Sequence, residues 1–278
     1  MRGVTAAAPT LQEIRKAHGS EPGRMAYERL LVVNRYVFRP VAFLLTWAAI
    51  RIGLTSEAIS WLSGVVGLLG CLFLMSASKT ALSIGLGTLF LFNLLDCVDG
   101  DIARTMHTRN PYGRFLDSVC GGVIDLGFWA VVGIMAFRHV ALLRYPDGFG
   151  YGPLLWLGVG GTTCFLAITL GYVEQGYDEL LHPAWRQLNQ PVSPSVTGSI
   201  PPENGEPPAR GVLRVIARNL RVRETHYVLL LITCWIRAVD LLLILYLAYY
   251  AVHVVLALLL YTHRGRAVRG LWPTGKTQ

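Results

Sequence analysis

The chain has 278 residues, of which 53% are hydrophobic and 15% are charged, and its mean hydropathy is +0.45. A soluble domain of this length carries more charge, so the composition indicates an integral membrane protein. The net charge is +8, but the basic residues gather in the segments between apolar runs, as in membrane proteins. We therefore expect no nucleic-acid partner.

The N-terminal part is polar over residues 1–27 and has no apolar run followed by a small-residue cleavage site, so a cleaved signal peptide is not expected. Residues 28–55 place arginines between apolar and aromatic residues, a pattern typical of an amphipathic helix in the headgroup layer. A seventh crossing over residues 37–50 is the alternative. That stretch is short for a span and would reverse the charge bias described below.

A transmembrane domain of six helices is predicted over residues 56–263, because several uncharged runs approach the ~20 residues that cross a bilayer. The stretch 225–262 is too long for one span, so we place a turn near Arg237–Asp240. Residues 183–212 are rich in Pro, Gly and Ser and predict a flexible cytoplasmic loop, and residues 264–278 form a basic tail. The predicted helices cover residues 57–78, 80–105, 113–138, 152–174, 224–238 and 240–262.

The charge distribution predicts the orientation of these helices. Of the 25 basic residues, 21 fall in the segments 1–56, 104–114, 174–224 and 263–278. In membrane proteins the cytoplasmic segments carry the excess of Lys and Arg. We therefore expect the protein to lie in the cell membrane with these segments on the cytoplasmic side. The aspartate-rich segment 96–125 then faces the cytoplasm too.

Ionisable side chains at membrane depth are costly and usually functional. Asp96 and Asp99 lie three residues apart, hence on one helix face. Asp117 lies at the start of the next helix, across a connection (105–112) short enough to make the two helices antiparallel neighbours. Three carboxylates can thus converge, and such hard oxygen ligands favour Mg²⁺ or Mn²⁺. Two such ions would suit a diphosphate substrate.

The segment from Asp96 onward resembles the signature of the CDP-alcohol phosphatidyltransferase family, D-x2-D-G-x2-A-R-x8-G-x3-D-x3-D. Seven of the eight fixed positions match. Residues 51–60 are also similar to the family's entry into its first membrane helix, so that the likeness spans about residues 35–262. The matching motif residues are Asp96, Asp99, Gly100, Ala103, Arg104, Gly113 and Asp117.

The resemblance implies metal-dependent transfer of a substituted phosphate from a CDP-alcohol, commonly CDP-diacylglycerol, to an alcohol acceptor. The resemblance also implies that CMP is released, that the reaction serves phospholipid or related lipid biosynthesis, and that the enzyme is a homodimer among membrane lipids. Asp96, Asp99 and Asp117 would be the catalytic residues and the ligands of Mg²⁺ or Mn²⁺. The donor-binding residues would be Gly100, Ala103, Arg104, Asn110, Gly113, Glu57 and Ser60, with Arg114 as a weaker addition.

Arginines before the fifth predicted helix have two interpretations. They anchor the chain to anionic headgroups, or some of them hold a phosphorylated acceptor. The acceptor-binding candidates are Arg218, Arg221 and Arg223.

The eighth motif position departs from the family pattern, because Gly121 stands where the resemblance implies an aspartate. That aspartate is thought to act as general base and to bind the second metal, and glycine can do neither. Asp125 lies one turn further, ~6 Å deeper along the helix, and His107 lies on the connecting loop with a suitable ordinary pKa. Both are candidates for the base, whereas Asp101 lies on the opposite helix face and is expected to be solvated or paired with arginine.

Two other functions remain open at this point. One is a degenerate relative that binds a CDP-lipid without catalysis, which the glycine at position 121 favours. The other is an intramembrane prenyltransferase, which also uses aspartates and Mg²⁺. The N-D-x-x-D-x-x-x-D pattern of those enzymes is not met, since Asn93 comes too early and Ala103 replaces the last aspartate.

Overall fold

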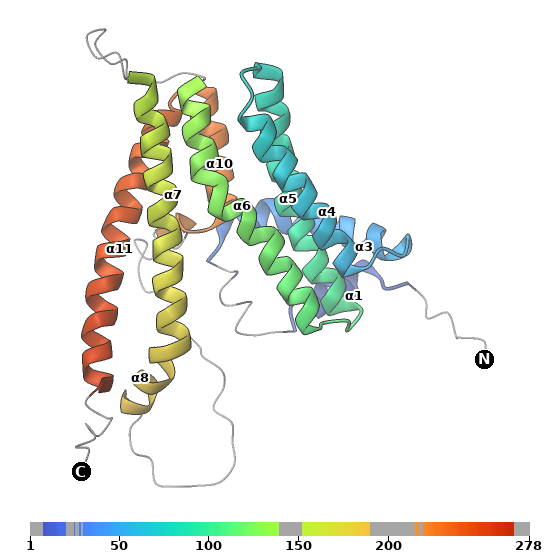
Figure 1. Ribbon diagram of the computed structural model, residues 1–278. Coiled ribbons are helices and arrows are strands. Elements are labelled where there is room, and N and C mark those ends of the chain that lie inside the picture. Colours follow the sequence, from blue (N-terminus) through green and yellow to red (C-terminus); the bar gives the residue numbers. More distant parts are fainter. Residues whose placement is uncertain are drawn as a thin grey trace.

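The computed structural model describes residues 8–20, 25, 28, 30–138, 152–189, 215–216 and 219–269. All regular elements among these residues are helical, as expected for an all-α membrane protein. Five helices are long and apolar enough to cross a membrane. They are α4 (Ser56–Leu74), α5 (Lys79–Thr105), α6 (Pro111–Arg138), α7 (Gly152–Gly176), whose span continues to Trp185, and α11 (Val239–Arg269) (Figure 1).

Shorter helices flank these five. The predicted fifth span corresponds to α10, which has 13 residues and so extends only ~20 Å. The predicted turn near Arg237–Asp240 lies between α10 and α11, where Arg237 has a φ of 58°. The shorter elements are α1 (Leu11–His18), a π-helical turn η1 (Asn34–Phe38), α3 (Arg39–Arg51), η2 (Tyr177–Leu181), α8 (His182–Asn189) and α10 (Arg223–Trp235).

Two of the predicted polar segments are described only in part. The expected loop 183–212 begins within α8, and its residues 190–212 lie outside the described residues. The expected basic tail 264–278 begins within α11, and residues 270–278 lie outside the described part.

The long helices form two connected groups (Figure 1). α4 and α5 pack as an antiparallel hairpin, while α7 packs between α6 and α11. α1 and α3 pack against α5 near the end that carries the α5–α6 connection. That connection, α8 and the end of α11 lie at the same end of the molecule (Figure 1).

A glycine on α4 allows this helix to pack closely against both α5 and α6, the helices that carry the motif aspartates. A Cβ built on Gly67 would lie 2.8 Å from Ile124 of α6 and 3.1 Å from Phe92 of α5, so α4 rests closely on both helices. α4 packs extensively against each of them, whereas α5 and α6 make few direct backbone contacts. α5 and α6 are antiparallel neighbours across their short connection, as expected, and the carboxylates of Asp96 and Asp117 come together there. Their short connection brings them together at one end, but α4 packs against both and the aspartates lie between them.

A second close approach joins α6 to α7. A Cβ built on Gly160 would lie 2.5 Å from the Cα of Gly133 and 2.9 Å from the carbonyl oxygen of Trp129. Both neighbours are backbone atoms and cannot move aside without shifting a helix. Close helix approach through small residues is typical of membrane interfaces.

Replacing Gly160 with leucine should therefore destabilise the protein. We expect Gly160→Leu to cost about 1–3 kcal/mol through overpacking and to lower the unfolding temperature measured in detergent micelles. Gly161→Leu is the matched control, because a Cβ there meets nothing within 4 Å, and its cost should stay within about 0.5 kcal/mol. Equal unfolding temperatures for the two variants would contradict the close helix contact.

Candidate active site

Local turns bring α4 and α6 beside the end of α5. Gly53 has a φ of 77°, a conformation that suits glycine, and it ends α3. Thr55 then caps α4 by accepting a hydrogen bond from the backbone N–H of Ala58 at 3.2 Å. The side chain of Asn110 caps α6 in the same way, since its Oδ1 accepts from the Gly113 N–H at 2.7 Å.

Asn110 also joins the two helix starts, because its Nδ2 donates to Oε1 of Glu57 at 3.3 Å. The structure thus gives this predicted donor-binding residue a role in local folding as well. Pro111 follows at the first position of α6, where its missing N–H is not needed.

A cavity of about 820 Å³ opens between these helix ends. All seven residues predicted to bind the donor line it, together with Asp99, Asp117 and Arg114. Its remaining lining is mostly apolar and includes Ile50, Leu54, Ile102 and Met106. The seven are Glu57, Ser60, Gly100, Ala103, Arg104, Asn110 and Gly113.

The three motif aspartates lie close to one another but have different partners. Asp99 is 3% exposed and accepts a hydrogen bond of 2.5 Å from the Ser60 hydroxyl. Asp117 lies close enough to Asp96 for their carboxyl groups to interact, and Asp96 pairs with Arg223 at 2.9 Å. No group of three acidic, His or Cys side chains among the described residues is arranged as a ready metal site.

Arg104 folds back along α5. Its Nη2 donates to Oδ1 of Asp101 at 2.5 Å, and a Cβ built on Gly100 would lie 3.1 Å from both Nη1 and Nη2. A side chain at position 100 would therefore press on the guanidinium. The glycine of the motif gives the arginine the space for this position.

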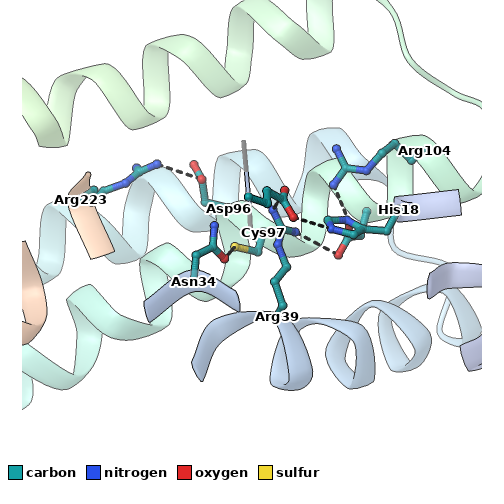
Figure 2. A network of polar contacts seen from close by, with 9 residues as sticks. His18, Asn34, Arg39, Asp96, Cys97, Arg104 and Arg223 are labelled. Atoms are coloured by element: carbon teal, nitrogen blue, oxygen red, sulfur yellow. Dashed lines mark hydrogen bonds and ion pairs between the residues drawn. The ribbon is translucent and has the colours of Figure 1, made fainter. Parts of the chain in front are cut away.

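Asp101 is the residue whose role the sequence did not reveal. Instead of being solvated, it is 1% exposed and lies in a buried network with Arg104, Arg39 and His18 (Figure 2). Arg39 Nη2 also donates to Glu28 at 2.8 Å. The expected pairing with arginine is present. Only the i, i+3 spacing of Asp101 and Arg104 could have indicated it, because His18 and Arg39 come from distant segments.

His18 joins α1 to this network. Its Nδ1 lies 2.9 Å from Asp101 and its Nε2 lies 2.7 Å from Glu28. Each nitrogen faces a carboxylate, so both donate when the imidazole is protonated. Burial alone would lower the pKa of His18, but the hydrogen bonds to Asp101 and Glu28 hold the pKa above its ordinary value.

The two candidates for a general base lie in different places. The side chain of Asp125 is 50% exposed, and its Oδ1 lies 3.7 Å from Nε of Arg223. His107 has a φ of 53° and lines a second cavity of about 910 Å³, whose described lining contains none of the three motif aspartates. Of the two, Asp125 is the one connected to the cluster, because Arg223 contacts both Asp125 and Asp96.

The three arginines that were predicted to bind the acceptor also lie in different places. Arg221 pairs with Glu174 of α7, whereas Arg223 reaches Asp96, and Arg218 lies outside the described residues. Arg221 and Arg223 line a small cavity of about 180 Å³ beside Asp125, with aromatic walls that include Trp129.

Comparison with known protein families gives one match to the segment that contains this cavity. The family model described as CDP-alcohol phosphatidyltransferase matches residues 53–170, which contain the whole motif and nearly all of the cavity lining. The family that the motif predicts thus matches this segment, which is less than half of the chain. No curated protein matches the chain.

The raised pKa of His18 predicts that docking of α1 depends on pH. A group whose pKa is higher in the folded state contributes stability below its unfolded pKa of 6.5, and this stability is lost as the pH rises through the folded value. We expect the backbone amides of α1 to lose protection against hydrogen exchange as the pH rises above the unfolded pKa of 6.5, after correction for intrinsic exchange. His18→Gln should remove this pH dependence. Constant protection of the unchanged protein as the pH rises would refute the role of His18.

Proposed function

We propose that the protein transfers a substituted phosphate from a CDP-alcohol, with CDP-diacylglycerol as the foremost candidate, to an alcohol acceptor in lipid biosynthesis. The acceptor oxygen bonds to the phosphorus that carries the donor alcohol. The bond from that phosphorus to the bridging oxygen breaks, CMP leaves with the bridging oxygen, and the acceptor hydroxyl loses its proton.

The main observation in support of this function is the cavity in the segment that matches the family model. Its volume of about 820 Å³ falls within the range of ligand pockets, and its lining combines carboxylates, three arginines and apolar side chains. The polar side chains suit a nucleoside diphosphate, and the apolar ones suit the lipid part of the donor.

The donor's phosphates are assigned to Arg104 in this proposal. A guanidinium binds phosphate through two parallel hydrogen bonds, and Asp101 fixes one edge of this group through Nη2. Gly100 and Ala103 lie one turn apart beside it and line the same cavity. Their small side chains let the nucleotide approach the backbone of α5.

The metal is likewise a proposal. Carboxylate oxygens of Asp96, Asp99 and Asp117 are the donor type that Mg²⁺ and Mn²⁺ prefer, and three interacting carboxylates repel one another unless a cation balances them. A bound divalent ion would neutralise the diphosphate and stabilise the charge that develops on the departing CMP. Ser60 fixes Asp99 through its 2.5 Å hydrogen bond.

Gly121 cannot accept the proton that the acceptor hydroxyl loses, so another residue must accept it. Asp125 is half exposed and lies on the α6 face of the cluster, so we assign proton acceptance to Asp125, directly or through water. The acceptor itself is assigned to the side of the cluster that contains Arg221 and Arg223. In this proposal the protein lies in the cell membrane with its site on the cytoplasmic side, and the enzyme is a homodimer.

A direct test is CMP release by purified protein with CDP-diacylglycerol, Mg²⁺ or Mn²⁺, and a panel of acceptors: glycerol phosphate, serine, inositol phosphate and inositol. We expect release that depends on both metal and acceptor. Binding of CDP-diacylglycerol without release for any acceptor would instead support the degenerate relative, which the missing carboxylate at position 121 favours.

Asp117→Asn should reduce this release roughly 100-fold or more, because loss of one carboxylate charge weakens a cation contribution worth several kcal/mol. Asp178→Asn is the matched control, since Asp178 is exposed on η2 and pairs with His182. Equal losses in both variants would argue against a special role for Asp117.

Arg104→Lys should raise the KM for the donor about tenfold, equivalent to ~1.4 kcal/mol. A lysine can approach Asp101 or a phosphate, but it lacks the planar fork that serves both. Arg264→Lys, on α11 beside Tyr177, should leave KM unchanged. An unchanged KM in Arg104→Lys would contradict the assignment of the donor phosphate to Arg104.

A further inference from the structure

We propose that the guanidinium of Arg223 takes the place of a second divalent ion on the Gly121 side of the aspartate cluster, so that the chain binds one ion instead of two. This inference rests on the proposed function. It concerns a residue outside the family-matched segment and a feature specific to this chain.

The geometry places Arg223 directly beside the space that the side chain of residue 121 would enter. Arg223 is the first residue of α10, and its Nη2 donates to Oδ2 of Asp96 at 2.9 Å (Figure 2). A Cβ built on Gly121 would lie 3.4 Å from Nη1 of Arg223 and 3.7 Å from Oδ1 of Asp96. The guanidinium and the Asp96 carboxylate therefore border the space into which an aspartate at 121 would project.

Charge balance follows from this position. The resemblance implies four carboxylates and two divalent ions, in which the charges cancel. Here Asp96, Asp99 and Asp117 provide three negative charges, and Arg223 contributes one fixed positive charge. One divalent ion then completes the balance of the motif carboxylates, while a second ion would meet the guanidinium without a ligand from residue 121.

The guanidinium is held firmly. It lies over the buried ring of Phe92, with its central carbon 4.7 Å from the ring centre, and the side chain is only 19% exposed. A cation over an aromatic face is stabilised by the ring's electron density. Asp125 holds the opposite side of the group at 3.7 Å.

One of its nitrogens, Nη1, remains available, whereas Nε faces the Asp125 carboxylate at 3.7 Å. Nη1 is buried and has no hydrogen-bond partner within the described part of the chain. Leaving such donors unpaired is costly, and Nη1 is the nitrogen that faces Gly121. An oxygen of the transferred phosphate would satisfy it. Arg223 thus supplies positive charge and hydrogen-bond donors, but no base.

The test is the number of Mn²⁺ ions bound per chain at saturation. Free Mn²⁺ is measured by electron paramagnetic resonance in detergent-purified protein with CDP present. We expect one ion for the unchanged protein and one for Arg223→Lys, which keeps the charge. Gly121→Asp/Arg223→Gln restores the carboxylate and removes the cation, so it should bind two.

Arg264→Gln is the matched control and should bind one ion, because Arg264 lies on α11 beside Tyr177. Zero or two ions in the unchanged protein would overturn the proposal, as would a single ion in the folded double variant. Elution of each variant as a single peak in size-exclusion chromatography verifies its folding. A failure of CMP release with every acceptor would count against the proposed function, whereas CMP release with two bound ions would contradict only the replacement by Arg223.

Discussion

The pairing of buried carboxylates with guanidinium groups along α5 is the constraint on which the rest of the structure depends. Asp96 and Asp101 belong to this helix. Asp96 pairs with Arg223 of α10. Asp101 pairs with Arg104 of α5 itself and with Arg39 of α3. Leaving one of these charges without a partner would cost several kcal/mol. The helix can therefore adopt its position only when α3 and α10 are in place beside it.

Close packing makes these pairings possible. Glycines let α4 lie against both α5 and α6, and the short connection between α5 and α6 brings their ends together at the site. The cavity lies at this end, and its lining includes Gly100 and Gly113 as well as Asp99 and Asp117. The glycines that pack α4 against its neighbours are different residues from those that line the cavity.

Much of the fold and the motif could be predicted from the sequence. Apolar run lengths indicate the long helices, and the spacing from Asp96 to Asp117 indicates both the carboxylate cluster and the family. The network around Asp101 could not be predicted, because His18 and Asp101 are 83 residues apart and no local pattern links them. The place of α4 against both α5 and α6 could not be predicted either, since a short connection fixes only the helix ends and small residues such as Gly67 decide which faces meet.

The contact between Arg223 and Asp96 joins residues 127 positions apart, and only one of them belongs to the segment 53–170 by which the family is recognised. His18 approaches the other face of α5 from the opposite end of the chain. Two proteins with the same family segment could therefore differ in the charge of their sites. For this protein, the chemistry of the shared segment depends on residues that its signature does not include.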